Sequence, residues 1–223
     1  MRSYSGPAGQ PPTPEQMHQW HRRIAPPDNE FPAGVGFTVL LGRTDDAAVG
    51  ITQIEAFSTG FRFTLAVRLR QARRDLVGGG LFTLIGPHTP PGIRVPLEER
   101  LLLGLEYPDG QRASTLDDWR VLGPGAAASG QDLVLASHGG GGSERSVDQT
   151  YWVSPLPPEG QVTFVLSWPA FGMPECRAVV DGAAIRAAAQ RSQLLWPPQP
   201  DMEPPAPLPP PRPSSGWFAA PSG

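Results

Sequence analysis

Residues 61–70 read FRFTLAVRLR, and their regular alternation decides the fold class. Every second position is apolar, at Phe61, Phe63, Leu65, Val67 and Leu69. Successive side chains of a β-strand point to opposite sides of its sheet. The pattern therefore predicts a strand with one face in a core and the other in water.

Short runs of similar character recur along the chain and are separated by turn signals. They are residues 35–41, 49–57, 80–86, 100–107, 111–116, 132–137, 149–154, 162–168 and 176–181. A glycine-containing turn at 58–60 predicts a hairpin, and the shifted apolar phase between Ile51 and Ile54 predicts a bulge near Thr52–Gln53. Because no helical pattern separates neighbouring runs, we expect an all-β fold, an antiparallel β-sandwich of the immunoglobulin-like or jelly-roll-like kind.

The ends of the chain have a different composition from its middle. The 223 residues include 29 prolines and 26 glycines, and the prolines concentrate near both termini. Such segments bury too little apolar surface to fold alone. We therefore expect a disordered N-terminal arm over residues 1–30, a β-sandwich domain over 31–197 and a disordered proline-rich tail over 198–223.

Two segments carry helix signals. Thr13 and Gln16 fit a capping box with proline at the first helical position, which predicts a short helix over 14–24. Asp181 is a suitable N-cap for the alanine-rich segment 182–196, the expected C-terminal helix of the domain. A helix as short as the first is unstable in isolation, so it must dock on its own domain or on a partner, or remain unfolded.

Charge and cysteine content exclude several classes of function. All 18 basic residues are arginine and the formal net charge is −3, whereas general nucleic-acid binders show a basic excess. The single cysteine, Cys176, allows neither an internal disulfide nor a cysteine-based zinc site. No apolar run reaches the ~18 residues that a membrane span needs, and the start lacks the apolar region of a signal peptide. We expect a cytoplasmic protein with neither nucleic acid nor membrane as partner.

The basic side of the 61–70 strand is a candidate surface for an anion or an acidic partner. Its arginines are Arg62, Arg68 and Arg70. The simpler interpretation is a solvated strand face, on which Glu55 and Glu106 would pair with these arginines across strands. The composition favours this simpler interpretation.

Residues 137–148 contain four consecutive glycines beside Ser137, His138 and Asp148. We expect a mobile hairpin loop here. A serine hydrolase is the alternative, but a triad requires preorganised geometry that a glycine-rich loop does not provide. The histidines and paired carboxylates form no recognisable metal, cofactor or acid–base pattern, so we assign no catalytic, metal or cofactor-binding residue.

Apolar residues within the two arms are candidates for partner contact, because hydrophobic side chains in a polar segment often mark a binding element. They are Met17, Trp20, Ile24, Trp217 and Phe218. The function favoured by the sequence is a non-catalytic protein-binding or scaffold module, acting through its arms or its sheet surface. The alternative is a small-ligand-binding protein or hydrolase with a site near residues 137–148.

Two segments carry a family resemblance. Residues 151–175, YWVSPLPPEGQVTFVLSWPAFGMPE, and the turn at 107–114, YPDGQRAS, resemble uncharacterised β-sandwich proteins of high-GC Gram-positive bacteria. The resemblance extends over roughly residues 35–196. It implies a sandwich with Trp168 in the core and Trp152 at the sheet surface, and it implies no known activity, cofactor or catalytic residue.

Overall fold

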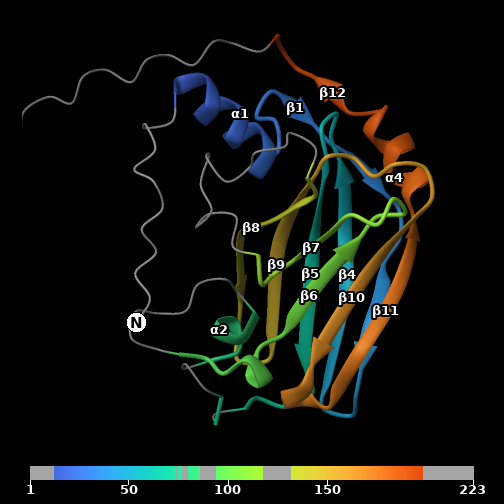
Figure 1. Cartoon of the computed structure of the whole chain (residues 1–223). Helices are drawn as coiled ribbons and strands as arrows, with labels where there is room; N and C mark the ends of the chain where they lie inside the picture. The colour runs from blue at the N-terminus through green and yellow to red at the C-terminus, as the bar shows by residue number, and fades with distance from the viewer. Residues whose placement is uncertain (1–12, 74, 77–79, 86–93, 118–131, 198–223) are drawn as a thin grey trace, which may run out of the picture.

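The computed structural model describes residues 13–73, 75–76, 80–85, 94–117 and 132–197 (Figure 1). Its helices are α1 (Pro14–Ile24), α2 (Leu81–Ile85) and α4 (Gly182–Ala189), with short 3-10 turns η2 (Leu97–Glu99) and η3 (Pro169–Phe171). Its strands are β1 (Glu30–Phe31), β2 (Ala33–Val35), β3 (Val39–Arg43), β4 (Ala47–Ala56), β5 (Phe61–Leu69), β6 (Leu102–Glu106), β7 (Arg112–Ser114), β8 (Val134–Gly142), β9 (Ser146–Ser154), β10 (Gln161–Trp168), β11 (Met173–Asp181) and β12 (Gln193–Leu194). Residues 1–12 and 198–223, with Trp217 and Phe218, lie outside the described residues, so the disordered arms stay predictions.

The strands of the described chain pair antiparallel in three sheets, which confirms the all-β class. A six-stranded sheet has the order β2-β4-β5-β9-β8, with β3 also paired to β4. A four-stranded sheet has the order β11-β10-β6-β7, and β1 and β12 form a small third sheet. Figure 1 shows the four-stranded sheet lying in front of the six-stranded one.

The main core lies between the inner faces of the two larger sheets. Phe63 of β5 meets Phe164 of β10 edge to face, with ring centroids 5.1 Å apart, and stacks on Tyr151 of β9 at 5.5 Å. Trp168 is fully buried, and its indole N–H donates to the Glu99 carbonyl oxygen at 3.0 Å. The apolar faces predicted for the 61–69 and 162–168 runs therefore point into one core, as expected.

The predicted hairpin and bulge are both confirmed. β4 and β5 pair directly around the turn at 58–60. Their register shifts between Thr52 and Glu55, so two residues of β4 oppose one residue of β5. The shift exposes Gln53 on the outer face of the sheet, while Ile54 stays buried in the core.

Two segments differ from their predicted structure. Residues 81–85 form the helix α2, not a strand, because Leu81, Leu84 and Ile85 are all buried and follow the i, i+3, i+4 spacing of one helix face. The C-terminal helix α4 ends at Ala189, seven residues before the predicted end at 196.

The early end of α4 has a tertiary cause. The Ser192 hydroxyl donates to the Ala189 carbonyl oxygen at 2.8 Å, and Gln193–Leu194 then pair as β12 with Glu30–Phe31 of β1. Helix propensity is a weak preference that such pairing overrides. This pairing also ties residues 29–31 to the C-terminal end of the described chain, whereas the composition had predicted a separate arm up to residue 30.

The glycine run is not a mobile loop, because it forms the second half of strand β8. Gly140, Gly141 and Gly142 pair with Gln149, Asp148 and Val147 of β9. A Cβ atom on Gly140 would lie 2.5 Å from the Asp148 carbonyl oxygen, whereas one on Gly141 would meet nothing within 4 Å. Glycine at 140 is therefore needed for the close approach of the two strands.

We expect Gly140→Ala to lower the free energy of unfolding by about 1–3 kcal/mol, since the added methyl must displace backbone. Gly141→Ala is the matched control and should stay within about 0.5 kcal/mol of the wild type. Urea unfolding of the two variants measures both values. Equal stability of the two would contradict the pairing of the glycine run with β9.

Alkaline pH should destabilise the fold through two tyrosines. Burial raises the pKa of both Tyr107 and Tyr151 above the ordinary value of 10.0. Both hydroxyls stay protonated in the folded state while the unfolded chain releases its protons above about pH 10. The free energy of unfolding should therefore fall as the pH rises from about 10, and Tyr151→Phe should reduce this dependence.

Urea unfolding as a function of pH measures the effect, and tyrosinate absorbance reports the protonation state. Two of the three tyrosines of the chain should ionise together with unfolding. Ionisation of all three near pH 10 in a chain with native circular dichroism would show that these hydroxyls are not buried.

Candidate functional site

The outer face of the six-stranded sheet carries a second, smaller apolar cluster. We call it the outer cluster, and it consists of Phe57, Val134, Ala136 and Trp152. Trp152 has no exposed surface, although its neighbour Tyr151 points into the main core on the other side of β9. The sequence predicts a solvated outer face for this sheet, but one end of that face is apolar and buried.

Helix α1 covers the outer cluster. Ile24 packs against it, and Trp20, one turn earlier on the same helix face, is 6 % exposed. The indole N–H of Trp152 donates to the Arg23 carbonyl oxygen at 2.9 Å, and the Ser154 hydroxyl donates to the same oxygen at 2.7 Å. The sequence left open where this helix docks, and in the structure it lies on its own domain, against β8 and β9.

The expected capping box begins this helix. The Thr13 hydroxyl accepts from the Gln16 amide N–H, and the Gln16 side chain accepts from the Thr13 N–H. Met17 of the same helix is half-buried. Two of the predicted partner-binding residues, Trp20 and Ile24, are thus engaged within the described chain.

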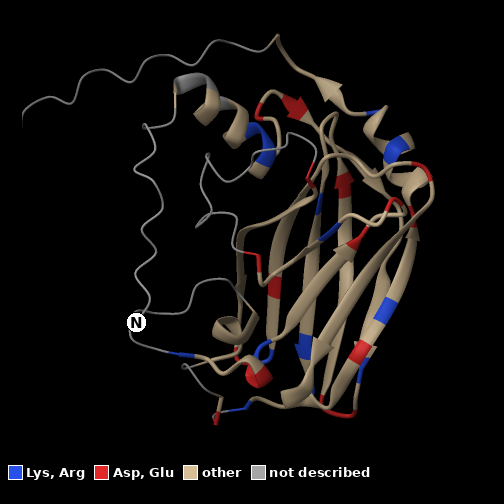
Figure 2. Cartoon of the chain, viewed as in Figure 1, with Lys and Arg blue, Asp and Glu red and all other residues tan. Residues whose placement is uncertain are grey.

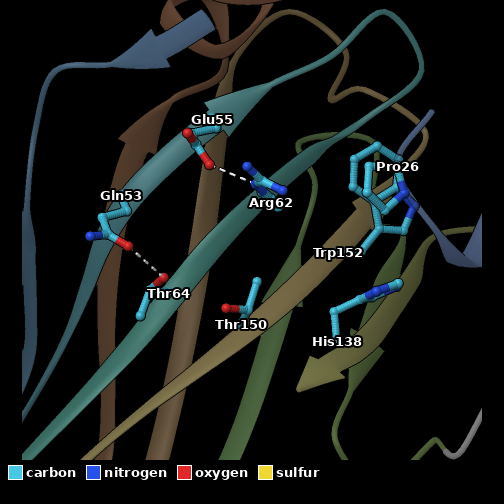
Figure 3. Close-up of a pocket in the computed structure, with 8 residues that line it drawn as sticks. All are labelled: Pro26, Gln53, Glu55, Arg62, Thr64, His138, Thr150 and Trp152. Atoms are coloured by element: carbon cyan, nitrogen blue, oxygen red, sulfur yellow. Dashed lines mark hydrogen bonds and ion pairs between the residues drawn. The ribbon is translucent and has the colours of Figure 1, made fainter. Parts of the chain in front are cut away.

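A groove of about 340 Å³ opens on the outer face of the six-stranded sheet, next to Pro26 after the C-terminal end of α1 (Figure 3). We call it the bulge groove. It is lined by Pro26, Gln53, Glu55, Arg62, Thr64, His138, Thr150 and Trp152. Its floor crosses β4, β5, β9 and β8, since the sheet register places Arg62 beside Trp152 and Thr64 beside Thr150.

A β-bulge lies at each side of the groove. On β4, the register shift turns Gln53 outward with a φ of 51°, a left-handed conformation that only glycine adopts without cost. On β8, the register shift between Ser137 and Gly140 leaves His138 and Gly139 opposite the single residue Thr150. The side chains of Gln53 and His138 face the groove from opposite sides (Figure 3).

The polar groups of the groove are arranged as pairs. The Arg62 Nε donates to a Glu55 carboxylate oxygen at 2.6 Å, and the Arg62 guanidinium also lies 5.3 Å from the centre of the Phe57 ring. The Thr64 hydroxyl donates to the Gln53 side-chain oxygen at 3.1 Å. Arg62 and Glu55 keep 38 % and 35 % of their side-chain surface exposed, so both can contact a ligand.

The remaining predicted arginines lie outside the groove. Arg68 forms two hydrogen bonds to the Asp148 carboxylate, at 2.8 and 3.2 Å. Arg70 follows the end of β5 in a bend and does not belong to the strand face. Glu106 does not pair with these arginines, because it lies in the four-stranded sheet beside Arg112 and Arg177. Figure 2 shows acidic and basic positions interspersed over the described chain.

The three residues of the alternative hydrolase site do not act on one another. Asp148 is engaged by Arg68, and the Ser137 hydroxyl accepts from the Gln149 side-chain amide at 2.8 Å. The His138 Nε2 donates to the Ile24 carbonyl oxygen at the end of α1. Among the described residues, the geometry thus brings no base to the serine hydroxyl.

The described residues hold neither a cluster of metal ligands nor a helix able to cross a membrane. No three histidine, cysteine or acidic side chains lie together as metal ligands. No helix there combines the length and the apolar character needed to cross a membrane.

Part of this site follows from the sequence. The phase shift near Gln53 gave the position of the β4 bulge, but its role in a groove required the neighbouring strands. Trp152 was expected at the sheet surface, and it does lie on the outer face but is fully covered. The sequence holds one signal that could have indicated the bulge on β8, which is the His138-Gly139 pair at the start of the glycine run.

Comparisons with known proteins do not extend this description. No family model matches the chain, and neither the curated proteins nor the solved structures contain a significant match. The resemblance to β-sandwich proteins of high-GC Gram-positive bacteria therefore stays a prediction.

The left-handed backbone conformation of Gln53 leads to a prediction about stability. Gln53→Gly and Gln53→Ala both lose the hydrogen bond from Thr64, but only glycine relieves the backbone strain. We expect the glycine variant to be more stable than the alanine variant by about 1 kcal/mol. Urea unfolding of the two variants measures the difference, and an alanine variant as stable as the glycine one would rule out strain at the bulge.

Proposed function

We propose that this chain is a non-catalytic protein-binding module whose partner docks in the bulge groove. The observation that carries the proposal is the pair of bulges, which bring Gln53 and His138 to opposite sides of one groove. Bulges are frequent beside functional sites because they redirect side chains, and a strained non-glycine residue is a further pointer to function. We also infer that the two larger sheets form an antiparallel β-sandwich of the immunoglobulin-like or jelly-roll-like kind.

The chemistry of the groove suits a polypeptide. An amide, two hydroxyls, an imidazole and a half-exposed ion pair supply both donors and acceptors, which complement the N–H and C=O groups of a peptide. Small-molecule sites are lined mostly by hydrophobic and aromatic side chains. Trp152, the aromatic residue of the lining, has no exposed surface to offer.

Charge favours a partner without a strong net charge. Arg62 is paired with Glu55 and Arg68 with Asp148, so neither presents an unmatched cation to nucleic acid. A cytoplasmic location is part of the proposal, in line with the single cysteine, whose thiol donates to the Pro174 carbonyl oxygen.

Affinity capture with matched variants of the full chain tests the proposal. The baits are the wild type, the groove variant Gln53→Ala/Arg62→Ala and the control Arg177→Ala, which removes a half-exposed arginine from the other sheet. We expect at least one protein whose capture falls about tenfold with the groove variant, a loss of ~1.4 kcal/mol, and is unchanged with the control.

Capture that is equal with all three baits would place the partner site elsewhere on the chain and contradict the proposal. If no protein is captured, a thermal-shift screen of small polar ligands tests the alternative. A stabilising ligand that loses its effect in the groove variant would make the groove a small-ligand site.

A further inference from the structure

The residues of the bulge groove use only part of their own hydrogen-bonding capacity. Arg62 donates to Glu55 through Nε, and among the described residues no group accepts from its terminal nitrogens Nη1 and Nη2. Glu55 accepts through Oε2 alone. Because both side chains keep more than a third of their surface exposed, their remaining donors and acceptors stay available to a ligand.

Arg62 offers its free donors to a group that enters the groove. Figure 3 shows the Arg62 guanidinium between Glu55 on one side and Trp152 on the other. Its Nε is engaged by Glu55, so Nη1 and Nη2 are left for a ligand. The Phe57 ring, whose centre lies 5.3 Å from the guanidinium carbon, helps to hold this orientation. A carbonyl oxygen has two lone pairs, and the planar fork of a guanidinium can donate to both.

Two acceptors lie beside each other at the β8 side of the groove. The Nε2 of His138 donates to the Ile24 carbonyl oxygen, so the neutral imidazole carries its proton on Nε2 and leaves Nδ1 as an acceptor. No group that the structure describes bonds to the Thr150 hydroxyl, which can accept as well as donate. Thr150 lies opposite His138 and Gly139 in the register of β8 and β9, so the two acceptors are neighbours.

The charges of the groove select against ionic ligand groups. A carboxylate that reached Arg62 would also approach the carboxylate of Glu55, and an ammonium group that reached Glu55 would approach the guanidinium. Like charges brought together cost free energy, and the ion pair itself has no net charge to attract either kind of ion. A neutral group that both accepts and donates hydrogen bonds avoids this cost.

We infer that the bulge groove recognises a side-chain carboxamide, an inference that rests on the proposed function because it names the asparagine or glutamine that a docked partner inserts. A carboxamide has one acceptor oxygen and two N–H donors in a single plane. Its oxygen accepts from the terminal nitrogens of Arg62, and its N–H groups donate to the Thr150 hydroxyl and to His138 Nδ1. A serine or threonine hydroxyl has only one donor and cannot satisfy both acceptors.

A peptide-display selection on the full chain tests the inference. The probe is a library of random heptapeptides, selected for binding to the wild type and against binding to the groove variant Gln53→Ala/Arg62→Ala. We expect the groove-dependent peptides to share an asparagine or glutamine at one position. Synthetic peptides with the corresponding acid at that position should bind about tenfold more weakly by fluorescence anisotropy, because they lose a donor and bring a like charge to Glu55.

Glu55→Gln tests the role of charge in this selectivity. The substitution keeps the size of the side chain but leaves Arg62 without a matching carboxylate, so the gap between the amide and the acid peptide should close or reverse. Glu175→Gln is the matched control, since it makes the same change in the ion pair with Arg177 on the other sheet. The control should keep the tenfold gap, and circular dichroism checks that each variant is folded.

The possible failures of the two proposals can be told apart. Groove-dependent peptides without a common carboxamide would overturn the inference and leave the proposed function standing. Equal binding of the amide and the acid peptide to the wild type would have the same meaning. If no peptide depends on the groove, the carboxamide site is ruled out, and affinity capture with the groove variant decides the proposed function separately.

Discussion

The edge-to-face contact of Phe63 with Phe164 is the interaction on which the rest of the structure depends. It joins the central strand of the six-stranded sheet to a central strand of the four-stranded one, at 5.1 Å between ring centroids. Once Phe63 is fixed in the core, the alternation of β5 sends Arg62 and Thr64 to the outer face. The position of the groove follows from this arrangement, because the strands that form its floor have their opposite face in the core.

The outer face of the six-stranded sheet is irregular because two β-bulges interrupt its strand pairing. A regular sheet would present a uniform row of side chains, whereas the two bulges bring Gln53 and His138 to the edges of one hollow. The bulge on β8 contains Gly139, which adopts its φ of 85° without strain. The bulge on β4 holds a glutamine in a comparable conformation, and its strain is compensated by the surrounding structure.

The arginines of β5 belong to a charge-paired surface. Arg62 meets Glu55 on the neighbouring strand, as the sequence allowed, but Arg68 meets Asp148, 80 residues away. Ion pairs of this half-exposed kind contribute little to stability, about 0–1 kcal/mol each. They also place a carboxylate beside each guanidinium, so neither Arg62 nor Arg68 presents an unmatched positive charge.

The sequence by itself determined whatever depends on near neighbours in the chain. The strand faces of 61–69 and 162–168, the hairpin at 58–60, the bulge at Gln53 and the capping box at Thr13 all follow from side-chain alternation, turn chemistry or bonds within four residues. Only the tertiary structure decided the features that rest on distant partners.

Helix α4 ends early because Gln193–Leu194 pair with Glu30–Phe31, and Trp152 is buried because α1, more than a hundred residues earlier, lies over it. The groove likewise combines side chains from four strands that no local pattern connects. Local rules specify which face of a strand is apolar, but what covers that face is set by chain segments that meet only when the molecule folds.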